Sequence, residues 1–250
     1  MTKIILSGCC GKMGTVISNL VKERSDCEIV AGVDKYDNGK CSFKVFPRFD
    51  DVSVQADVII DFSNPDVLND MLSFAKSTGT PCVIATTGYN DEQVNLIKEA
   101  SREIAVFFTF NMSIGINLMT ELAKKATQVL SDTFDIEIIE KHHNQKIDAP
   151  SGTAIMLANA VSSKLETPPR YEYDRHSKRT KREKAEIGIH SVRGGTIVGE
   201  HEIIFAGHDE ILSIKHQAMS KEIFASGALN AAVFLSTKAT GLYEMSDMLK

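Results

Sequence analysis

The sequence predicts an α/β protein in which a doubly wound parallel sheet is followed by an α+β region with a mixed sheet. Short apolar runs alternate with helix-forming stretches from the N-terminus to about Phe108, which is typical of a parallel sheet covered by helices. Small or polar turns follow these runs, and after Gly115 the pattern changes to longer alternating segments. The change predicts two domains in one chain.

Composition excludes several classes of protein. The chain has 250 residues, of which 43% are hydrophobic and 24% charged, as in soluble globular proteins. The net charge of −5 argues against general nucleic-acid binding, and no apolar run is long enough to span a bilayer. The five cysteines include no CxxC pair, and the N-terminal residues lack the layout of a signal peptide. We therefore expect a cytoplasmic protein with no membrane or nucleic-acid partner.

The N-terminal segment has the pattern of the first half of a dinucleotide-binding unit. Lys3–Ser7 predicts a short buried strand, and an apolar-periodic helix follows to Val21. Between them lies GCCGKMG, with glycines at Gly8, Gly11 and Gly14. Such a turn lets a pyrophosphate approach the backbone at a helix start. The spacing is GxxGxxG, so a tight turn in any α/β protein is an alternative interpretation.

A second strand, Cys27–Val33, ends at Asp34. An acid at this position would hydrogen-bond the ribose 2′-hydroxyl of NAD, whereas Lys35 could pair with the 2′-phosphate of NADP. The sequence therefore supports either cofactor. Asp34 could also be an ordinary turn residue after a strand.

Further strands are expected at Asp57–Asp61, after Pro81 and at residues 104–108. Helices are expected between them, one capped by Ser63 or Asn64 and one over residues 91–101. Parallel sheets of this kind bind ligands outside the carboxyl ends of their strands. The loops expected there are Gly8–Gly14, Asp34–Lys35, Phe62–Asn64, Thr86–Gly88 and Phe110–Gly115.

A domain boundary is expected at Asn111–Gly115, followed by a long helix and a strand at Phe134–Glu140. Residues 168–184 hold seven Lys and Arg against three acids, which predicts a solvated, mobile loop, with contact to an anionic ligand or nucleic acid as the alternative. Three extended segments follow, and we expect hairpins at Gly194–Gly195 and Gly207–Asp209. Residues 220–248 predict a helix that could belong to either domain.

The stretch Glu140–Ala154, reading EKHHNQKIDAPSGTA, concentrates ionisable side chains between that strand and an apolar-periodic helix. Its two adjacent histidines can transfer protons near neutral pH. Its lysine and the helix start, with a glycine and a Ser/Thr cap, suit a carboxylate. We expect a site for a small anion that gains or loses a proton, with a basic loop before a capped helix as the alternative. The candidate residues are His142, His143, Lys146, Ser151, Gly152 and Thr153.

The chain contains, in this order, GCCGKMG, DFSNPD, ATTG, FNMSIGIN, EIIEKHHNQKIDAPSGTA, SVRGGTIVGEHEIIFAG and FASGALNAA. In this it resembles, almost end to end, the 4-hydroxy-tetrahydrodipicolinate reductase family, also called dihydrodipicolinate reductase. The resemblance implies NADH- or NADPH-dependent reduction of a cyclic conjugated imine with two carboxylates, in lysine and diaminopimelate biosynthesis. It also implies a homotetramer with a Rossmann-like domain at residues 1–113 and 221–250 and an α+β domain with an open mixed sheet at residues 114–220.

The family's motif also implies roles for single residues. His142 falls on the catalytic proton donor and Lys146 on the second catalytic group, and no metal is expected. The positions that hold the substrate's carboxylates fall on His143, Ser151, Gly152 and Thr153. The cofactor contacts expected from the resemblance and from the strand-end loops are Gly8, Gly11, Lys12, Met13, Gly14, Asp34, Lys35, Phe62, Ser63, Thr86, Thr87, Gly88, Phe110, Asn111 and Met112. The chain departs from the family at Asn144 and at Lys12, where arginine is common.

Parts of the sequence are also compatible with other functions. Another Rossmann oxidoreductase acting on an imine or ketone remains an alternative, although the YxxxK pair occurs only as Tyr36–Lys40, directly after a strand. A metal-dependent hydrolase is disfavoured because adjacent strand residues such as His142 and His143 point to opposite sides. Ser151 lacks the G-x-S-x-G context of a nucleophile. A regulator that binds NAD(P) without catalysis is the alternative from a different class.

Overall fold

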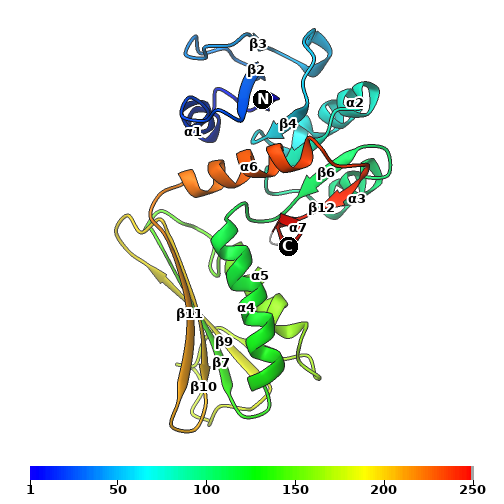
Figure 1. Ribbon diagram of the computed structural model, residues 1–250. Coiled ribbons are helices and arrows are strands. Elements are labelled where there is room, and N and C mark those ends of the chain that lie inside the picture. The colour runs from blue at the N-terminus through cyan, green and yellow to red at the C-terminus, as the bar shows by residue number, and fades with distance from the viewer. Residues whose placement is uncertain (249–250) are drawn as a thin grey trace. The chain divides into compact units, whose positions relative to one another are not determined.

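The computed structural model describes residues 1–248 and divides them into two compact units (Figure 1). The first unit contains residues 1–113 and the chain from residue 221 onward, and the second contains residues 114–220. The chain therefore passes between the units twice, after Ser113 and after Ser220. Nucleotide binding by the first unit and substrate binding by the second remain predictions.

The first unit is built on a seven-stranded sheet in which every pair of neighbouring strands is parallel. The strand order is β12-β6-β5-β4-β1-β2-β3. This confirms the doubly wound parallel sheet expected from the sequence. The strands are β1 (Thr2–Ser7), β2 (Cys27–Val33), β3 (Val45–Phe46), β4 (Val58–Asp61), β5 (Cys82–Ile84), β6 (Ala105–Phe108) and β12 (Gly241–Tyr243).

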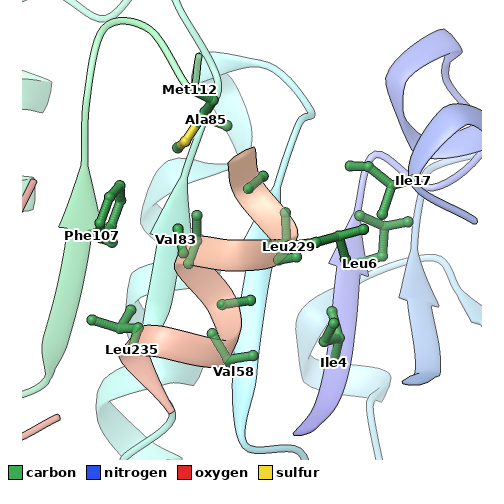
Figure 2. Packing of buried hydrophobic residues seen from close by; sticks show 14 of the residues in the cluster. Ile4, Leu6, Ile17, Val58, Val83, Ala85, Phe107, Met112, Leu229 and Leu235 are labelled. Carbon is green, nitrogen blue, oxygen red and sulfur yellow. The ribbon is translucent and has the colours of Figure 1, made fainter. Parts of the chain in front are cut away.

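Helices cover both faces of this sheet because successive strand residues point to opposite sides. Ile4 and Leu6 of β1 pack with α1 (Lys12–Val21) and α6 (Glu222–Leu235), whereas Ile5 packs with α2 (Leu68–Thr78) and α3 (Asp91–Ala100). Figure 2 shows Leu229 and Leu235 of α6 against the side chains of the sheet. Short helical segments lie at η1 (Phe49–Asp51), η2 (Pro65–Val67) and α7 (Met245–Met248).

The prediction of a single helix over residues 220–248 is wrong in the length of the helix. Helix α6 ends at Leu235, and the chain then forms β12, which pairs with β6 at the edge of the first sheet. Pairing with a distant strand overrides the helical pattern here, and the local sequence does not encode that partner.

The second unit has a five-stranded mixed sheet in the order β11-β10-β7-β9-β8. Strand β7 runs parallel to β9 and antiparallel to β10. Helices α4 and α5 contribute to one core with residues from one face of this sheet. The elements are α4 (Ile114–Leu130), β7 (Asp135–His142), α5 (Gly152–Ser162), β8 (Arg170–Glu172), β9 (Glu186–Arg193), β10 (Gly199–Ala206) and β11 (Ile211–Ala218).

The hairpin expected at Gly194–Gly195 is wrong, because β7 lies between β9 and β10. The Gly194 N–H donates to the His142 carbonyl at 2.9 Å, and the Asn144 N–H donates to the Gly195 carbonyl at 3.2 Å. The glycine turn therefore lies against the end of β7. The second expected hairpin is confirmed, since β10 and β11 pair directly across the turn at Gly207.

The basic stretch between α5 and β9 is not a purely solvated loop. Arg182 donates to Asp135 and Glu137 on β7, each at 2.9 Å, and its side chain is 18% exposed. Five of the seven basic side chains pair with carboxylates, namely Arg170, Arg175, Lys178, Arg182 and Lys184. The paired cations argue against an anionic ligand along this stretch. No helix in the described part of the chain is long and apolar enough to cross a membrane.

We expect Gly227→Ala to destabilise the first unit. A Cβ on Gly227 in α6 would lie 1.8 Å from the Met112 carbonyl oxygen, so the helix would have to move away from the segment that follows β6. We expect a loss of about 3 kcal/mol in the free energy of unfolding, measured by urea denaturation. Gly152→Ala is the matched control, because a Cβ on this helical glycine would meet no other atom within 4 Å. Equal effects of the two substitutions would contradict the close packing of α6.

Candidate active site

A cavity of about 670 Å³ lies at the carboxyl ends of β1, β2 and β4 in the first unit. The strand order reverses between β1 and β4, and such a switch point is where doubly wound sheets bind their ligands. Six of the expected cofactor residues line this cavity: Gly8, Gly11, Asp34, Lys35, Phe62 and Ser63.

The glycine turn leaves a helix start open to a phosphate. Gly8 has φ +76° and its N–H donates to the Val33 carbonyl at 2.9 Å, which links the turn to β2. Gly11 caps α1 without a side-chain hydrogen bond, and no acidic residue lies in the first turn. The first N–H groups of α1 therefore suit the negative charge of a pyrophosphate. Gly14 serves packing, because a Cβ there would lie 2.3 Å from the Gly8 carbonyl oxygen.

Polar side chains around the cavity also fit a dinucleotide. The Asp34 carboxylate accepts the Cys10 N–H at 2.9 Å, which holds the acid at the end of β2. Lys35 lines the cavity together with Arg48. This second cation was not predicted from the sequence, because it follows the very short strand β3. The Ser7 hydroxyl is 1% exposed, lines the same cavity and has no hydrogen-bond partner in the described chain. An orphaned hydroxyl at the floor of a cavity suits a polar ligand.

Two of the expected loops do not line this cavity. In the turn at residues 86–88, Gly88 lies next to Pro65, and therefore close to the loop after β4. Asn111 accepts the Ser113 N–H at 2.8 Å, and Met112 lies in the hydrophobic core (Figure 2). The buried side chain of Met112 is therefore not placed to meet a cofactor. Phe110 remains exposed, with its ring against Phe108. The expected contacts outside the cavity lining are Lys12, Met13, Gly14, Thr86, Thr87, Gly88, Phe110, Asn111 and Met112.

The second unit contains a buried carboxylate at the end of β7. Alternation places Ile136, Ile138, Glu140 and His142 on the helix-covered face of that strand. The Glu140 side chain is 0% exposed, and its Oε2 lies 2.6 Å from Nδ1 of His142. A charge buried this completely requires several strong partners.

Arg193 supplies the main partner from β9. Its Nη1 and Nη2 donate to the two oxygens of Glu140 at 2.8 and 2.7 Å, in the forked geometry of a strong charge-assisted pair. Burial by itself would raise the pKa of Glu140, but the hydrogen bonds from Arg193 and His142 outweigh it and hold the pKa at about 2. Glu140 is therefore ionised near neutral pH, so Nδ1 of His142 carries a proton toward it.

The start of α5 closes the same cluster. The Ser151 N–H donates to Glu140 at 3.1 Å, and the Ser151 hydroxyl accepts the Ala154 N–H at 3.2 Å. That hydroxyl also lies 3.0 Å from Nε2 of His201 on β10. Ser151 is buried and its hydroxyl is engaged as the helix cap, whereas Gly152 is exposed and Thr153 half-buried.

His142 is the member of the cluster that can exchange a proton with a ligand. Its side chain is 12% exposed. Its Nε2 lies next to Gly199, where an added Cβ would be only 3.2 Å from that nitrogen. Burial lowers the pKa of His142, and the positive charges of Lys146 and Arg193 lower it further, while Glu140 opposes them. Lys146 lies 2.9 Å from the exposed Asp148 carboxylate. His143 follows β7 and is half-buried.

Three members of this cluster were not predicted from the sequence: Glu140, Arg193 and His201. Two of them could be recognised in the sequence. Glu140 and His201 are polar residues at buried-face positions of alternating strands, where apolar residues are expected. Arg193 could not be recognised from the sequence, because only the register of β7 with β9 brings it opposite His142. The assembled cluster holds the His142 ring, and with it a protonatable nitrogen, in one fixed orientation.

Comparison with known proteins identifies related sequences over nearly the whole chain. The family described as dihydrodipicolinate reductase, N-terminus, matches residues 2–112, and its counterpart for the C-terminus matches residues 115–249. A 4-hydroxy-tetrahydrodipicolinate reductase of Clostridium novyi is 49% identical over 100% of this chain and 99% of its own length. One from Caldanaerobacter subterraneus is 48% identical, again over 100% of this chain and 99% of its own length.

Solved structures show the same architecture. A dipicolinate-bound dihydrodipicolinate reductase from Paenisporosarcina has a TM-score of 0.80 and 26% identity, over 98% of this chain and 97% of that one. A probable dehydrogenase from Thermotoga maritima has a TM-score of 0.64 at 10% identity, over 98% of this chain and 92% of that one. The second likeness shows a shared fold alone.

We expect the second unit to lose stability between pH 6.5 and 4 through His201. Burial, followed by the nearby His142, lowers the pKa of His201 to about 4, and the side chain is 5% exposed. The unfolded chain binds a proton at this histidine from pH 6.5 downward, whereas the folded chain does not, so stability falls as pH falls. The full loss is about 3 kcal/mol. Urea denaturation at pH 7.5 and 4.5, for wild type and His201→Gln, measures this loss. An equal fall in the free energy of unfolding of both proteins between the two pH values would rule out the role of His201.

Proposed function

The chain belongs to the dihydrodipicolinate reductase family, and on that premise we propose that it reduces 4-hydroxy-tetrahydrodipicolinate with NADH or NADPH, in lysine and diaminopimelate biosynthesis. The observation that carries the proposal is the fixed orientation of His142. Its Nδ1 is held 2.6 Å from the buried Glu140, and Arg193 clamps that carboxylate from the other side. This leaves Nε2 as the nitrogen that exchanges a proton with the substrate.

We propose that the substrate's carboxylates bind beside this histidine. Lys146 supplies a full positive charge, and its present partner, Asp148, is an exposed side chain that a substrate carboxylate can displace. The first turn of α5 supplies backbone N–H groups at Gly152 and Thr153 and the positive end of the helix dipole. His143 is the remaining residue expected to bind the substrate's carboxylates. These groups fix the ring's orientation before reaction.

The reaction needs a proton donor where negative charge develops on the ring. NADH or NADPH, when bound, supplies the hydride. Free His142 has a lowered pKa, because burial and the charges of Lys146 and Arg193 disfavour its protonated form. A dicarboxylate bound beside it would oppose those cations and raise its pKa. Substrate binding therefore charges the acid, and protonated His142 or Lys146 then stabilises and protonates the reduced ring.

We propose that the first unit accepts both cofactor forms. Asp34 suits the ribose 2′-hydroxyl of NADH, while Lys35 and Arg48 line the same cavity and suit the 2′-phosphate of NADPH. With one acid and two cations at one end of the cavity, the protein's charges exclude neither NADH nor NADPH.

We further propose a homotetramer in the cytoplasm. Helices α4 and α5 pack against one face of the second sheet, and the edge strand β11 leaves Ile211 and Leu212 exposed. Exposed apolar surface of this kind supports self-association. All five cysteines are free thiols, which agrees with a reducing compartment.

We expect NADH and NADPH to be oxidised only when the condensation product of pyruvate and aspartate semialdehyde is supplied. His142→Ala and Lys146→Ala should each lower kcat by about 100-fold or more, because each removes a group that carries the developing charge. Their affinity for NADPH without substrate should change by less than about twofold, since neither residue belongs to the first unit. Loss of cofactor absorbance gives kcat, and fluorescence titration gives the affinity for NADPH.

His208→Ala is the matched control, because this histidine lies in the β10–β11 turn with its side chain 97% exposed. Unchanged turnover in both active-site variants would overturn their assignment. Folded protein that binds NADPH but oxidises neither cofactor would favour a non-catalytic regulator or a different imine or ketone substrate.

We expect Glu140→Gln to lower kcat and to move the high-pH limb of the activity profile to lower pH. Glu140 is a positioning residue that raises the pKa of His142, so removing its charge leaves less of the histidine protonated at a given pH. A fall in kcat of about 10- to 100-fold is expected, with a smaller change in KM. Glu183→Gln is the control, because it removes an exposed partner of Arg170. A lower kcat with an unmoved pH profile would indicate a merely structural role.

A further inference from the structure

Three thiols converge beside the glycine turn of the first unit. The sulfur atoms of Cys9, Cys10 and Cys41 all lie within 4.8 Å of one another. Cys9 is buried, and Cys10 and Cys41 are half-buried, so the cluster is shielded but reachable from solvent. Sequence patterns do not indicate this grouping, because Cys41 is separated from the pair by the whole of α1 and β2.

The fold holds the three thiols in place. The Cys10 N–H donates to Asp34 at 2.9 Å, and its carbonyl accepts the Asn38 side-chain N–H at 3.3 Å, so the turn and the loop before Cys41 are tied together. Cys9 fills the space beside Gly32, where an added Cβ would lie 2.5 Å from its sulfur. The cluster is therefore part of the packed turn.

We propose that Cys9, Cys10 and Cys41 form a binding site for a thiophilic cation of the Zn²⁺ class. The sulfurs of Cys9 and Cys10 lie 3.9 Å apart. Two thiolates on one tetrahedral zinc, each at about 2.3 Å, lie about 3.8 Å apart. A small rotation of the Cys41 side chain would complete three ligands, and water would take the fourth position.

The electrostatics of the cluster favour a cation. The thiolate, and not the thiol, is the metal ligand, so a bound cation releases the protons of the thiols that hold it. Asp34 acts on Cys9 and Asp37 on Cys41, so two carboxylates add to the negative field.

Metal binding at this site would oppose nucleotide binding. Three thiolates and one divalent cation carry a net charge of −1, whereas three thiols carry none. This charge would develop in the turn whose helix start suits a pyrophosphate, and beside Asp34. Repulsion between the two anions predicts that the metal lowers affinity for NADPH by about fivefold.

The test is titration of the reduced full-length chain with Cd²⁺ and Zn²⁺ under anaerobic conditions. We expect one Cd²⁺ per chain with thiolate-to-metal charge-transfer absorption, and displacement by Zn²⁺. Cys10→Ala and Cys41→Ala should each weaken binding by about 100-fold and remove the absorption. Cys27→Ala is the matched control, because Cys27 is a buried thiol that lies outside the cluster. NADPH affinity should fall with Zn²⁺ in wild type and stay constant in Cys41→Ala.

Equal Cd²⁺ binding by wild type and both cluster variants would overturn the proposal. So would the absence of a stoichiometric complex in the reduced protein, including the case in which air oxidation alone joins Cys10 to Cys41 as a disulfide. Metal uptake and NADPH binding are measured without the reductase substrate, so these outcomes are independent of the proposed activity.

Discussion

The second unit depends on the ionised, fully buried carboxylate of Glu140. Arg193, His142 and the N–H of Ser151 all donate to it, and they come from β9, β7 and the start of α5. One charge therefore joins two strands and a helix. Removing one partner of a buried pair of this kind costs about 3–5 kcal/mol, because the remaining charge is left without compensation. Burial lowers the pKa of His142, and the same charge opposes that shift and fixes the orientation of the ring, so the packing of the unit and the state of this histidine depend on one interaction.

The two units share one local arrangement, in which a helix start lies beside a carboxylate that the protein itself holds. In the first, an uncapped start of α1 lies beside an acid, Asp34, that is held by the turn itself. In the second, the start of α5 lies beside Glu140, which is held by Arg193. Each helix start offers N–H groups to a ligand while the nearby carboxylate is already satisfied within the protein. A phosphate or carboxylate can therefore bind without meeting an unpaired negative charge.

Much of the architecture could be predicted because its signals are local. Apolar runs between turn residues located β1, β2, β4 and β6 within one or two residues. The expected Ser/Thr cap located the start of α5, where the structure shows Ser151 as the capping residue. The errors have a common cause. The Gly194–Gly195 turn does not close a hairpin, and β12 replaces part of an expected helix, because in each case a strand pairs with a partner far away in sequence.

The sequence by itself determined the glycine turn after β1, the acid and lysine at the end of β2, and the His142–Lys146 stretch before α5, because each is a short motif. Only the tertiary structure decided that β7 lies between β9 and β10. That order sets Arg193 opposite His142 and His201 opposite Glu140. Strand order and register depend on the packing of whole faces, and no single segment of the chain encodes them.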